Sequence, residues 1–140
     1  MAFRGIHHVG VAVLDLDEAI ATYERLFGAT LERRGLIEGQ GVEAAYLRVG
    51  AGRVELLSAT GPDTPVARFL AKRGPGIHHL AFEAASRAAV NERADWLRSQ
   101  GAEIESGPEE YWYMPGYYAV FFYDPDGMKL EILNVPGHAA

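Results

Sequence analysis

Alternating apolar and polar positions predict a strand near the start of the chain, and the same alternation returns about seventy residues later. In residues 6–13 one face carries His7 and three valines, and the other carries His8 with a glycine and an alanine. In residues 77–83 the faces again separate bulky from smaller or polar side chains, with His79 on the less crowded face. We therefore expect the bulky face of each strand to pack under a helix and the other face to leave room beside it.

A helix is predicted after each of these strands, and three further strands after each helix. Apolar side chains recur at helical spacing between the acidic residues at 15–17 and Gly28, and again over residues 86–100. The later strands are predicted over residues 29–34, 42–49, 53–57, 102–105, 117–123 and 128–135, with loops at 35–41 and 107–116. Each half of the chain is thus β-α-β-β-β, and the fold class is α+β with two tandem βαβββ modules.

The repeat also predicts the domain organisation. A chain of 140 residues fits one compact domain, and two Ile-His-His steps, with their second histidines 71 residues apart, mark its two halves. A short helix over residues 66–72, with Pro65 at its first turn, lies in the connector between them. We expect a single domain over residues 1–140, with module one at 5–58, a linker at 59–75 and module two at 76–135.

The composition and net charge of the chain exclude several kinds of function. A net charge of −6 argues against nucleic-acid and anionic-membrane partners, and no stretch has the pattern of a membrane span or a signal peptide. The sequence has no cysteine, which excludes disulfides and thiolate chemistry and suits a reducing compartment. We expect a cytoplasmic protein that binds a small molecule.

Each module offers one histidine on its first strand and one glutamate on its last. On the uncrowded faces these are His8 and Glu55 in module one, and His79 and Glu131 in module two. If the modules pair about a pseudo-twofold axis, the four side chains converge on one point. Two imidazoles and two carboxylates suit a single divalent ion, namely Co, Mn, Ni, Zn or Fe(II), so we expect these four residues to be metal ligands.

Purely structural roles for these residues compete with the metal-site interpretation. A single histidine on a strand is usually a hydrogen-bonding partner, and it is the repeat that favours a metal role. His7 and His78 share the apolar faces and are expected to be structural, while His138 lies in the tail. The aromatic run from Tyr111 to Tyr118 is either a pocket wall or packing, and the turn at 124–127 lacks the ligand series of a calcium loop.

These residues resemble the vicinal oxygen chelate superfamily, which includes glyoxalase I, extradiol dioxygenases, bleomycin-resistance proteins and methylmalonyl-CoA epimerases. The resemblance covers nearly the whole chain. It implies modules that pair into a curled, half-open mixed sheet around a metal cavity, and a homodimer. Carried over residue by residue, it places the metal ligands at His8, Glu55, His79 and Glu131.

Residues 6–83 resemble the methylmalonyl-CoA epimerases most, whereas residues 121–131 follow a more general glyoxalase-like pattern. The epimerase-like stretches are residues 8–13, 40–42, 54–57, 63–70 and 72–83. This resemblance implies a metal-dependent enzyme that epimerises a 2-substituted malonyl-CoA, such as methylmalonyl-CoA, through an enolate. Glu131 would act as the base as well as a ligand.

A second glutamate found in some of these epimerases falls at Ala44, and we expect the neighbouring Glu43 on the opposite strand face. Two alternatives to the epimerase stay open. One is a glyoxalase-I-type lyase or isomerase acting on another small substrate, and the other is a non-catalytic binding protein of the bleomycin-resistance kind. Dioxygenase chemistry usually uses two histidines and one carboxylate, so a fourth protein ligand disfavours it.

Overall fold

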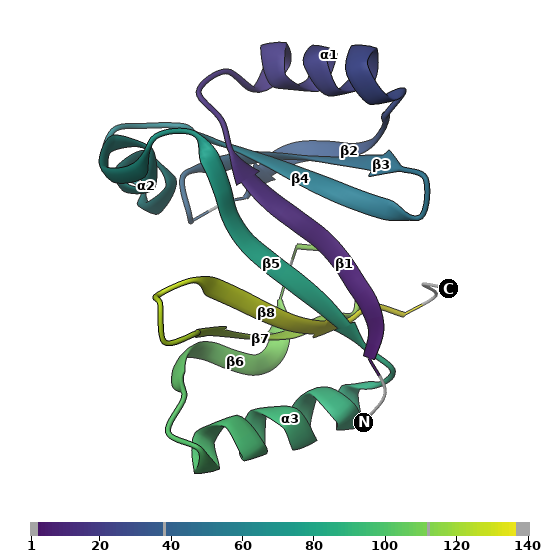
Figure 1. Ribbon diagram of the computed structural model, residues 1–140, viewed down its shortest axis with the longest axis vertical. Coiled ribbons are helices and arrows are strands. Elements are labelled where there is room, and N and C mark those ends of the chain that lie inside the picture. Colours follow the sequence, from purple (N-terminus) through teal and green to yellow (C-terminus); the bar gives the residue numbers. More distant parts are fainter. Residues whose placement is uncertain (1–2, 38, 112, 137–140) are drawn as a thin grey trace. The chain divides into compact units, whose positions relative to one another are not determined.

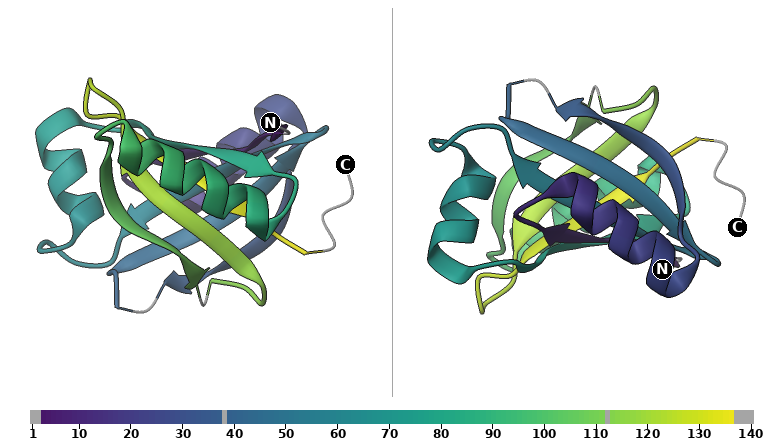
Figure 2. Two further views of the ribbon diagram at one scale, coloured as in Figure 1. Left: turned by 90° about the horizontal axis from the view of Figure 1, so that it is seen from below. Right: turned by 90° about the horizontal axis from the view of Figure 1, so that it is seen from above.

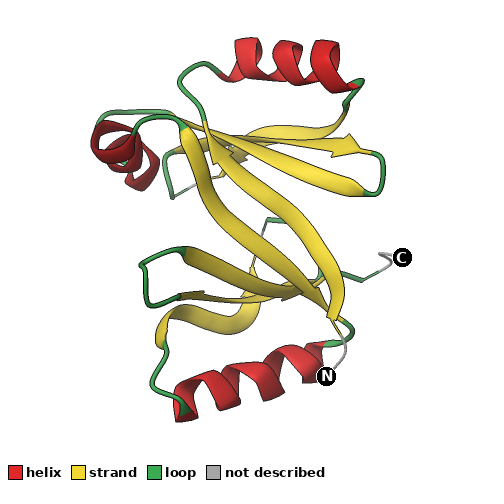
Figure 3. Cartoon of the chain, viewed as in Figure 1, coloured by secondary structure: helices red, strands yellow, loops and turns green. Residues whose placement is uncertain are grey.

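The computed structural model describes residues 3–37, 39–111 and 113–136, and its chain forms two compact units of strands and helices (Figure 1). The first unit comprises His8–His78, and the second comprises the residues up to His7 together with those from His79 on. Strands β1 (Phe3–Ala12) and β5 (Gly76–Ala84) each contribute residues to both units. Figure 3 shows the helices and strands of each unit.

In the first unit, helix α1 (Leu16–Phe27) lies against strands β2 (Thr30–Ile37), β3 (Val42–Val49) and β4 (Gly52–Ala59) (Figure 2, right). The strand order is β2-β3-β4-β1, with antiparallel pairs except for the parallel pair of β4 and β1. The Asp15 carboxylate accepts a hydrogen bond from the Glu18 amide, and Gly28 ends the helix in the left-handed conformation. The core under α1 consists of buried apolar side chains: Leu16, Ile20, Ala29, Ala45, Leu47 and Leu56.

A second core of the first unit forms against helix α2 (Pro65–Arg73), which packs on β4. The Thr64 hydroxyl caps this helix by accepting a hydrogen bond from the Ala67 amide. The buried side chains of this core are Ala12, Val42, Ala44, Leu57 and Val66. Leu56 and Leu57 therefore serve different cores, as strand alternation requires.

In the second unit, helix α3 (Arg87–Ser99) lies against strands β6 (Glu103–Tyr111), β7 (Tyr117–Tyr123) and β8 (Lys129–Asn134) (Figure 2, left). The strand order is β5-β8-β7-β6, and β5 and β8 form its parallel pair. One core, under α3, consists of Ala84, Val90, Ala94, Val120, Phe122 and Ile132. The other consists of Ala81, Tyr117, Ala119, Phe121, Leu133 and Val135.

The predicted α+β fold class is confirmed, since each module has the order β-α-β-β-β and its strands mix parallel and antiparallel pairs. Neither strand order closes into a barrel within the described residues. The predicted hairpin turn at 124–127 is also present, because the Asp124 carboxylate accepts hydrogen bonds from the amides of Asp126 and Met128. In the part of the chain that the structure describes, no helix has the length and apolar character needed to cross a membrane.

Two predicted loops are shorter than expected. Strand β2 continues to Ile37, with Gly35 paired to Ala44, and β6 continues to Tyr111. In β6, shifts of register between Ile104 and Glu109 accommodate the extra residues of the strand. The expectation was wrong here because glycine was taken as a strand end, whereas pairing with a neighbouring strand holds it in place.

Candidate functional site

Strand pairing in each unit places one histidine and one glutamate on the same sheet face. In the first unit Gly10 of β1 pairs with Glu55 of β4, and in the second Ala81 of β5 pairs with Glu131 of β8. His8 stands two residues before Gly10, and His79 two residues before Ala81. Because side chains alternate along a strand, each histidine shares a face with the glutamate of its own unit. The same local geometry is thus built twice.

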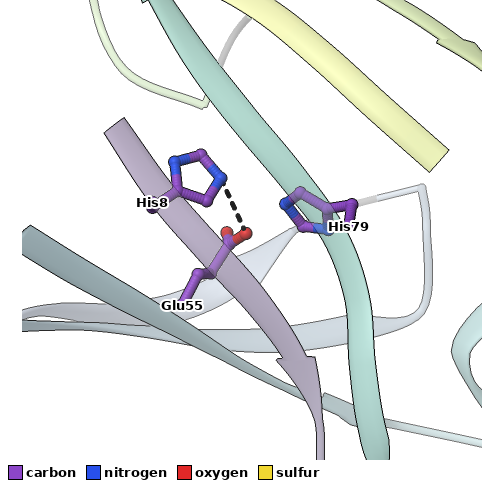
Figure 4. A group of neighbouring side chains, drawn as sticks. All are labelled: His8, Glu55 and His79. Carbon is purple, nitrogen blue, oxygen red and sulfur yellow. Dashed lines mark ion pairs between the residues drawn. The ribbon is translucent and has the colours of Figure 1, made fainter. Parts of the chain in front are cut away.

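The pair in the first unit is buried. The Nε2 atom of His8 lies 3.5 Å from Oε1 of Glu55, and the two residues are 1% and 5% exposed (Figure 4). The rings of Tyr46 and His8 are nearly perpendicular, with 5.3 Å between centroids, and Tyr46 of β3 stands opposite Glu55. Burial of a carboxylate is costly unless hydrogen bonds, an opposite charge or a metal compensates for lost water.

The pair in the second unit is equally buried. His79, on β5, has its Nε2 atom 3.9 Å from Oε1 of Glu131, and Glu131 is 1% exposed. The hydroxyl of Tyr117 donates a hydrogen bond to Oε2, the other oxygen of this carboxylate. Tyr117 is itself buried. Glu131 is thus held from one side by a side chain of the neighbouring strand β7.

The chemistry of these side chains fits a divalent metal ion. His8, Glu55 and His79 are buried residues with ligand atoms of the kind that hold such an ion. Imidazole nitrogen and carboxylate oxygen suit Zn, Mn, Fe(II), Co and Ni, and the absence of thiolate disfavours a structural zinc site. Glu131, the fourth residue expected from the sequence, offers the same kind of oxygen in the second unit.

The competing histidines lie in different surroundings. His7 is buried, while His78 is partly exposed and its ring meets the Phe69 ring edge-on, at 5.0 Å between centroids. Phe69 belongs to α2, so His78 takes part in packing between this helix and β5 within the first unit. His138 lies outside the described residues.

Glu43 and Ala44 lie on opposite faces of β3, as predicted. Oε2 of Glu43 accepts a hydrogen bond from Nε of Arg34 at 3.0 Å, and Arg34 also donates to Asp17. These two carboxylates raise the pKa of the Arg34 guanidinium. Ala44 is buried in the core against α2, so the position of the second epimerase glutamate carries no ionisable group.

The aromatic run divides between packing and a cavity wall. The rings of Tyr111 and Tyr113 are stacked, 5.3 Å between centroids, and Tyr113 meets Tyr117 edge-on at 5.2 Å. A cavity of about 350 Å³ in the second unit is lined by Glu110, Tyr111, Met114 and Pro115. Tyr113 and Tyr117 take part in packing, Met114 lines the cavity, and Tyr111 does both.

Tyr117 was not singled out from the sequence. It stands 14 residues before Glu131, and only the pairing of β7 with β8 brings its hydroxyl to the carboxylate. A tyrosine that begins an apolar strand normally indicates packing, and nothing in the local pattern marks this hydroxyl as a partner of Glu131.

The family model for the glyoxalase/bleomycin resistance protein/dioxygenase superfamily matches residues 5–132. The chain belongs to this superfamily, and the resemblance inferred from its motifs is confirmed. The match extends through both units and includes all four histidine and glutamate positions described above.

Similar proteins include several named epimerases. The ethylmalonyl-CoA/methylmalonyl-CoA epimerase of Cereibacter sphaeroides is 30% identical over 93% of this chain and 97% of its own length. The 2-epi-5-epi-valiolone epimerase of an Actinomyces species is 33% identical over 96% of this chain and 81% of its own. A methylmalonyl-CoA epimerase solved with methylmalonyl-CoA and NH4+ superposes with a TM-score of 0.84 at 29% identity, covering 97% of each chain. The first curated relatives are matched over only 45% to 60% of their own length.

Proposed function

We propose that this chain is a divalent-metal-dependent epimerase acting on a 2-substituted malonyl-CoA, such as methylmalonyl-CoA. The observation that carries the proposal is the repeated pair: in each unit a buried histidine and a buried glutamate lie on adjacent parallel strands. Relatives named methylmalonyl-CoA epimerase support the substrate class.

In this proposal His8, Glu55, His79 and Glu131 hold one metal ion, and residues 1–140 act as a single domain with modules at 5–58 and 76–135 joined by residues 59–75. Two imidazole nitrogens and two carboxylate oxygens leave coordination positions open for substrate oxygens. A bound divalent ion would stabilise the negative charge that develops on those oxygens when an enolate forms.

The reaction moves one proton. The hydrogen on the carbon between the thioester and the carboxylate is acidic, since its removal gives an enolate delocalised onto the thioester oxygen. Glu131 accepts this proton as a general base, and return of a proton to the opposite face inverts the carbon. We do not assign the opposite-face role to Glu43, because its carboxylate is paired with Arg34.

A second candidate is epimerisation of a ketone in a polyhydroxylated ring. The observation that favours it is Ala44, which stands where some methylmalonyl-CoA epimerases have a glutamate. The 2-epi-5-epi-valiolone epimerase, which is 33% identical over 96% of this chain, supports the same candidate. The proton removed would again lie next to a carbonyl group, so the same ligands and the same base would serve. This candidate belongs to the class of isomerases acting on another small substrate.

Three further expectations belong to the proposal. The acyl-CoA is the small-molecule partner, the protein is a homodimer, and it resides in the cytoplasm. The first is supported by the named relatives, the second by the family resemblance and the third by a sequence without cysteine.

The test is deuterium exchange followed by proton NMR. The protein is loaded in turn with Co(II), Mn(II), Ni(II) and Zn(II) and incubated in D2O with methylmalonyl-CoA or, separately, with 2-epi-5-epi-valiolone. We expect exchange at the carbon between the thioester and the carboxylate, and none with the Glu131→Gln variant. Exchange of the cyclic ketone alone would establish the second candidate, and metal binding without exchange of either substrate would leave a binding protein.

A further inference from the structure

The carboxylate of Glu131 has two oxygens with different neighbours. Oε1 is the oxygen 3.9 Å from Nε2 of His79, and Oε2 accepts the hydrogen bond from the Tyr117 hydroxyl. All three side chains are buried. In such surroundings a hydrogen bond to a carboxylate is strong, and it fixes the rotation of the group.

The ring of Tyr117 is itself held in place. It belongs to a buried cluster with Ala119 and Phe121, and it meets the Tyr113 ring edge-on. Tyr113 stacks on Tyr111, which meets Phe121 edge-on. These ring contacts hold in place the ring that carries the hydroxyl.

The first unit has no hydroxyl at the matching position. Phe121 pairs with Glu131 on β8, and Tyr46 pairs with Glu55 on β4. Counting the same four residues back along β7 and β3 equates Tyr117 with Val42, a buried apolar residue. At this matching position the two units differ, with a tyrosine beside Glu131 and a valine in the unit of Glu55.

We infer that Tyr117 is a positioning residue that binds Oε2 of Glu131 and presents Oε1, the oxygen that would serve both proposed roles of this carboxylate, as metal ligand and as general base. A carboxylate with one oxygen committed to a hydroxyl binds a metal through the other, which leaves more of the coordination sphere for substrate. The inference rests on the proposed function to the extent that Glu131 is taken as a ligand. It adds a residue whose own atoms need not touch metal or substrate.

The test compares Tyr117→Phe with Tyr118→Phe. Tyr118 is the adjacent residue on β7, and its hydroxyl donates to Asn91 of α3 instead. Metal-free protein is titrated with Co(II) alone, and affinity is measured by calorimetry while the visible Co(II) spectrum is recorded. We expect Y117F to weaken Co(II) binding about 10–100-fold, as loss of a partner that orients a ligand does, and to change the spectrum. Y118F should match the wild type in both.

If Tyr117 acts by orienting Glu131, the effect of Y117F on Co(II) affinity should depend on the presence of Glu131. In a Glu131→Ala background, Y117F should have no further effect on Co(II) affinity, because the group that it orients is gone. If Y117F lowers the melting temperature but leaves Co(II) affinity and spectrum unchanged, the hydroxyl is merely structural and the inference is wrong.

A measurement on the wild type covers the case in which Y117F does not fold. With ¹³C-labelled tyrosine, addition of Zn(II) should shift the resonances of Tyr117 and leave those of Tyr118 in place, and an unmoved Tyr117 would overturn the inference. A failure of the proposed function alone gives a different set of results. Co(II) would bind and Y117F would weaken its binding, but neither substrate would exchange deuterium. A wild type that binds no Co(II) would overturn both.

Discussion

Nε2 of His8 and Oε1 of Glu55 lie 3.5 Å apart on parallel strands, and both residues are almost fully buried. The arrangement comes from pairing, since Glu55 stands beside Gly10 and His8 points to the same side two residues earlier. A histidine and a carboxylate buried together have a clear chemical use as ligands, because a metal ion compensates for the water that both have lost.

The first prediction concerns this glutamate. Glu55→Gln keeps the size of the side chain but removes its charge, so Co(II) affinity should fall more than tenfold, measured by calorimetry on metal-free protein. The matched control is Glu43→Gln in the same unit, which removes the charge that pairs with Arg34. That partly exposed pair should cost about 0–1 kcal/mol of stability and leave Co(II) affinity unchanged. Equal affinities for E55Q and the wild type would remove Glu55 from the ligand set.

A second prediction concerns backbone geometry in β6. Gly107 has a φ of 86°, and a Cβ added there would lie 2.4 Å from the carbonyl oxygen of Ala119 on β7. Gly107→Ala should lower the free energy of unfolding by at least roughly 1–3 kcal/mol, which is what such a backbone conformation costs a non-glycine residue. Gly35→Ala is the control, because Gly35 lies in β2 with open space around it. Urea unfolding should show a change of about 0.5 kcal/mol or less for G35A, and a G107A protein as stable as G35A would contradict the argument.

A third prediction concerns alkaline pH. The Tyr123 hydroxyl donates to the Glu105 carboxylate, and this hydrogen bond, with partial burial, raises the pKa of Tyr123 to about 12. In the unfolded chain the phenol ionises near pH 10, roughly its ordinary value. The folded state therefore holds this proton where the unfolded state has lost it, so the contribution of Tyr123 is complete below about pH 10 and is lost as pH rises towards 12.

Thermal unfolding between pH 8 and pH 12 tests this point. The melting temperature of the wild type should fall more steeply above pH 10 than that of Tyr123→Phe, which has no phenol proton at this position to lose. Tyr123 is only partly buried, so we expect the difference in slope to be modest. Parallel curves for the two proteins would show that the hydrogen bond to Glu105 contributes nothing to stability.

Local patterns in the sequence were sufficient for most of the fold. The capping residues Asp15 and Gly28 delimit α1 as predicted, and the two-residue alternation assigned the faces of β1 and β5. The predictions were wrong where the local pattern is ambiguous. Gly35 indicates a strand end in isolation, yet in the structure it pairs with Ala44. The same ambiguity shortened β6, whose register shifts depend on β7.

The candidate site, like the fold, could be predicted only where local sequence patterns carry the information. Each histidine and its glutamate could be proposed because the same residue types recur at matching places in two modules, and strand alternation then selected His8 over His7. Tyr117 could not be proposed, because its role depends on which residue of β8 its side chain reaches. A side chain that spans from one strand to another leaves no periodic signal in the sequence.

The last prediction separates the two histidines of β5. His79 is buried beside Glu131, whereas the ring of His78 packs against Phe69. His79→Ala should abolish stoichiometric metal binding, because it removes a ligand nitrogen. His78→Ala should retain the metal and lose about 0.5–1.5 kcal/mol with the ring contact, in addition to the loss of buried area.

Both variants are purified in parallel, metal content is measured by mass spectrometry, and stability is measured by urea unfolding of the metal-free proteins. Working without metal is essential, since a bound ion stabilises the folded state by itself and would mix the two effects. The reverse result, with metal lost from H78A and retained by H79A, would mean that the face assignment of β5 is wrong. Metal retained by both would place the site elsewhere in the chain.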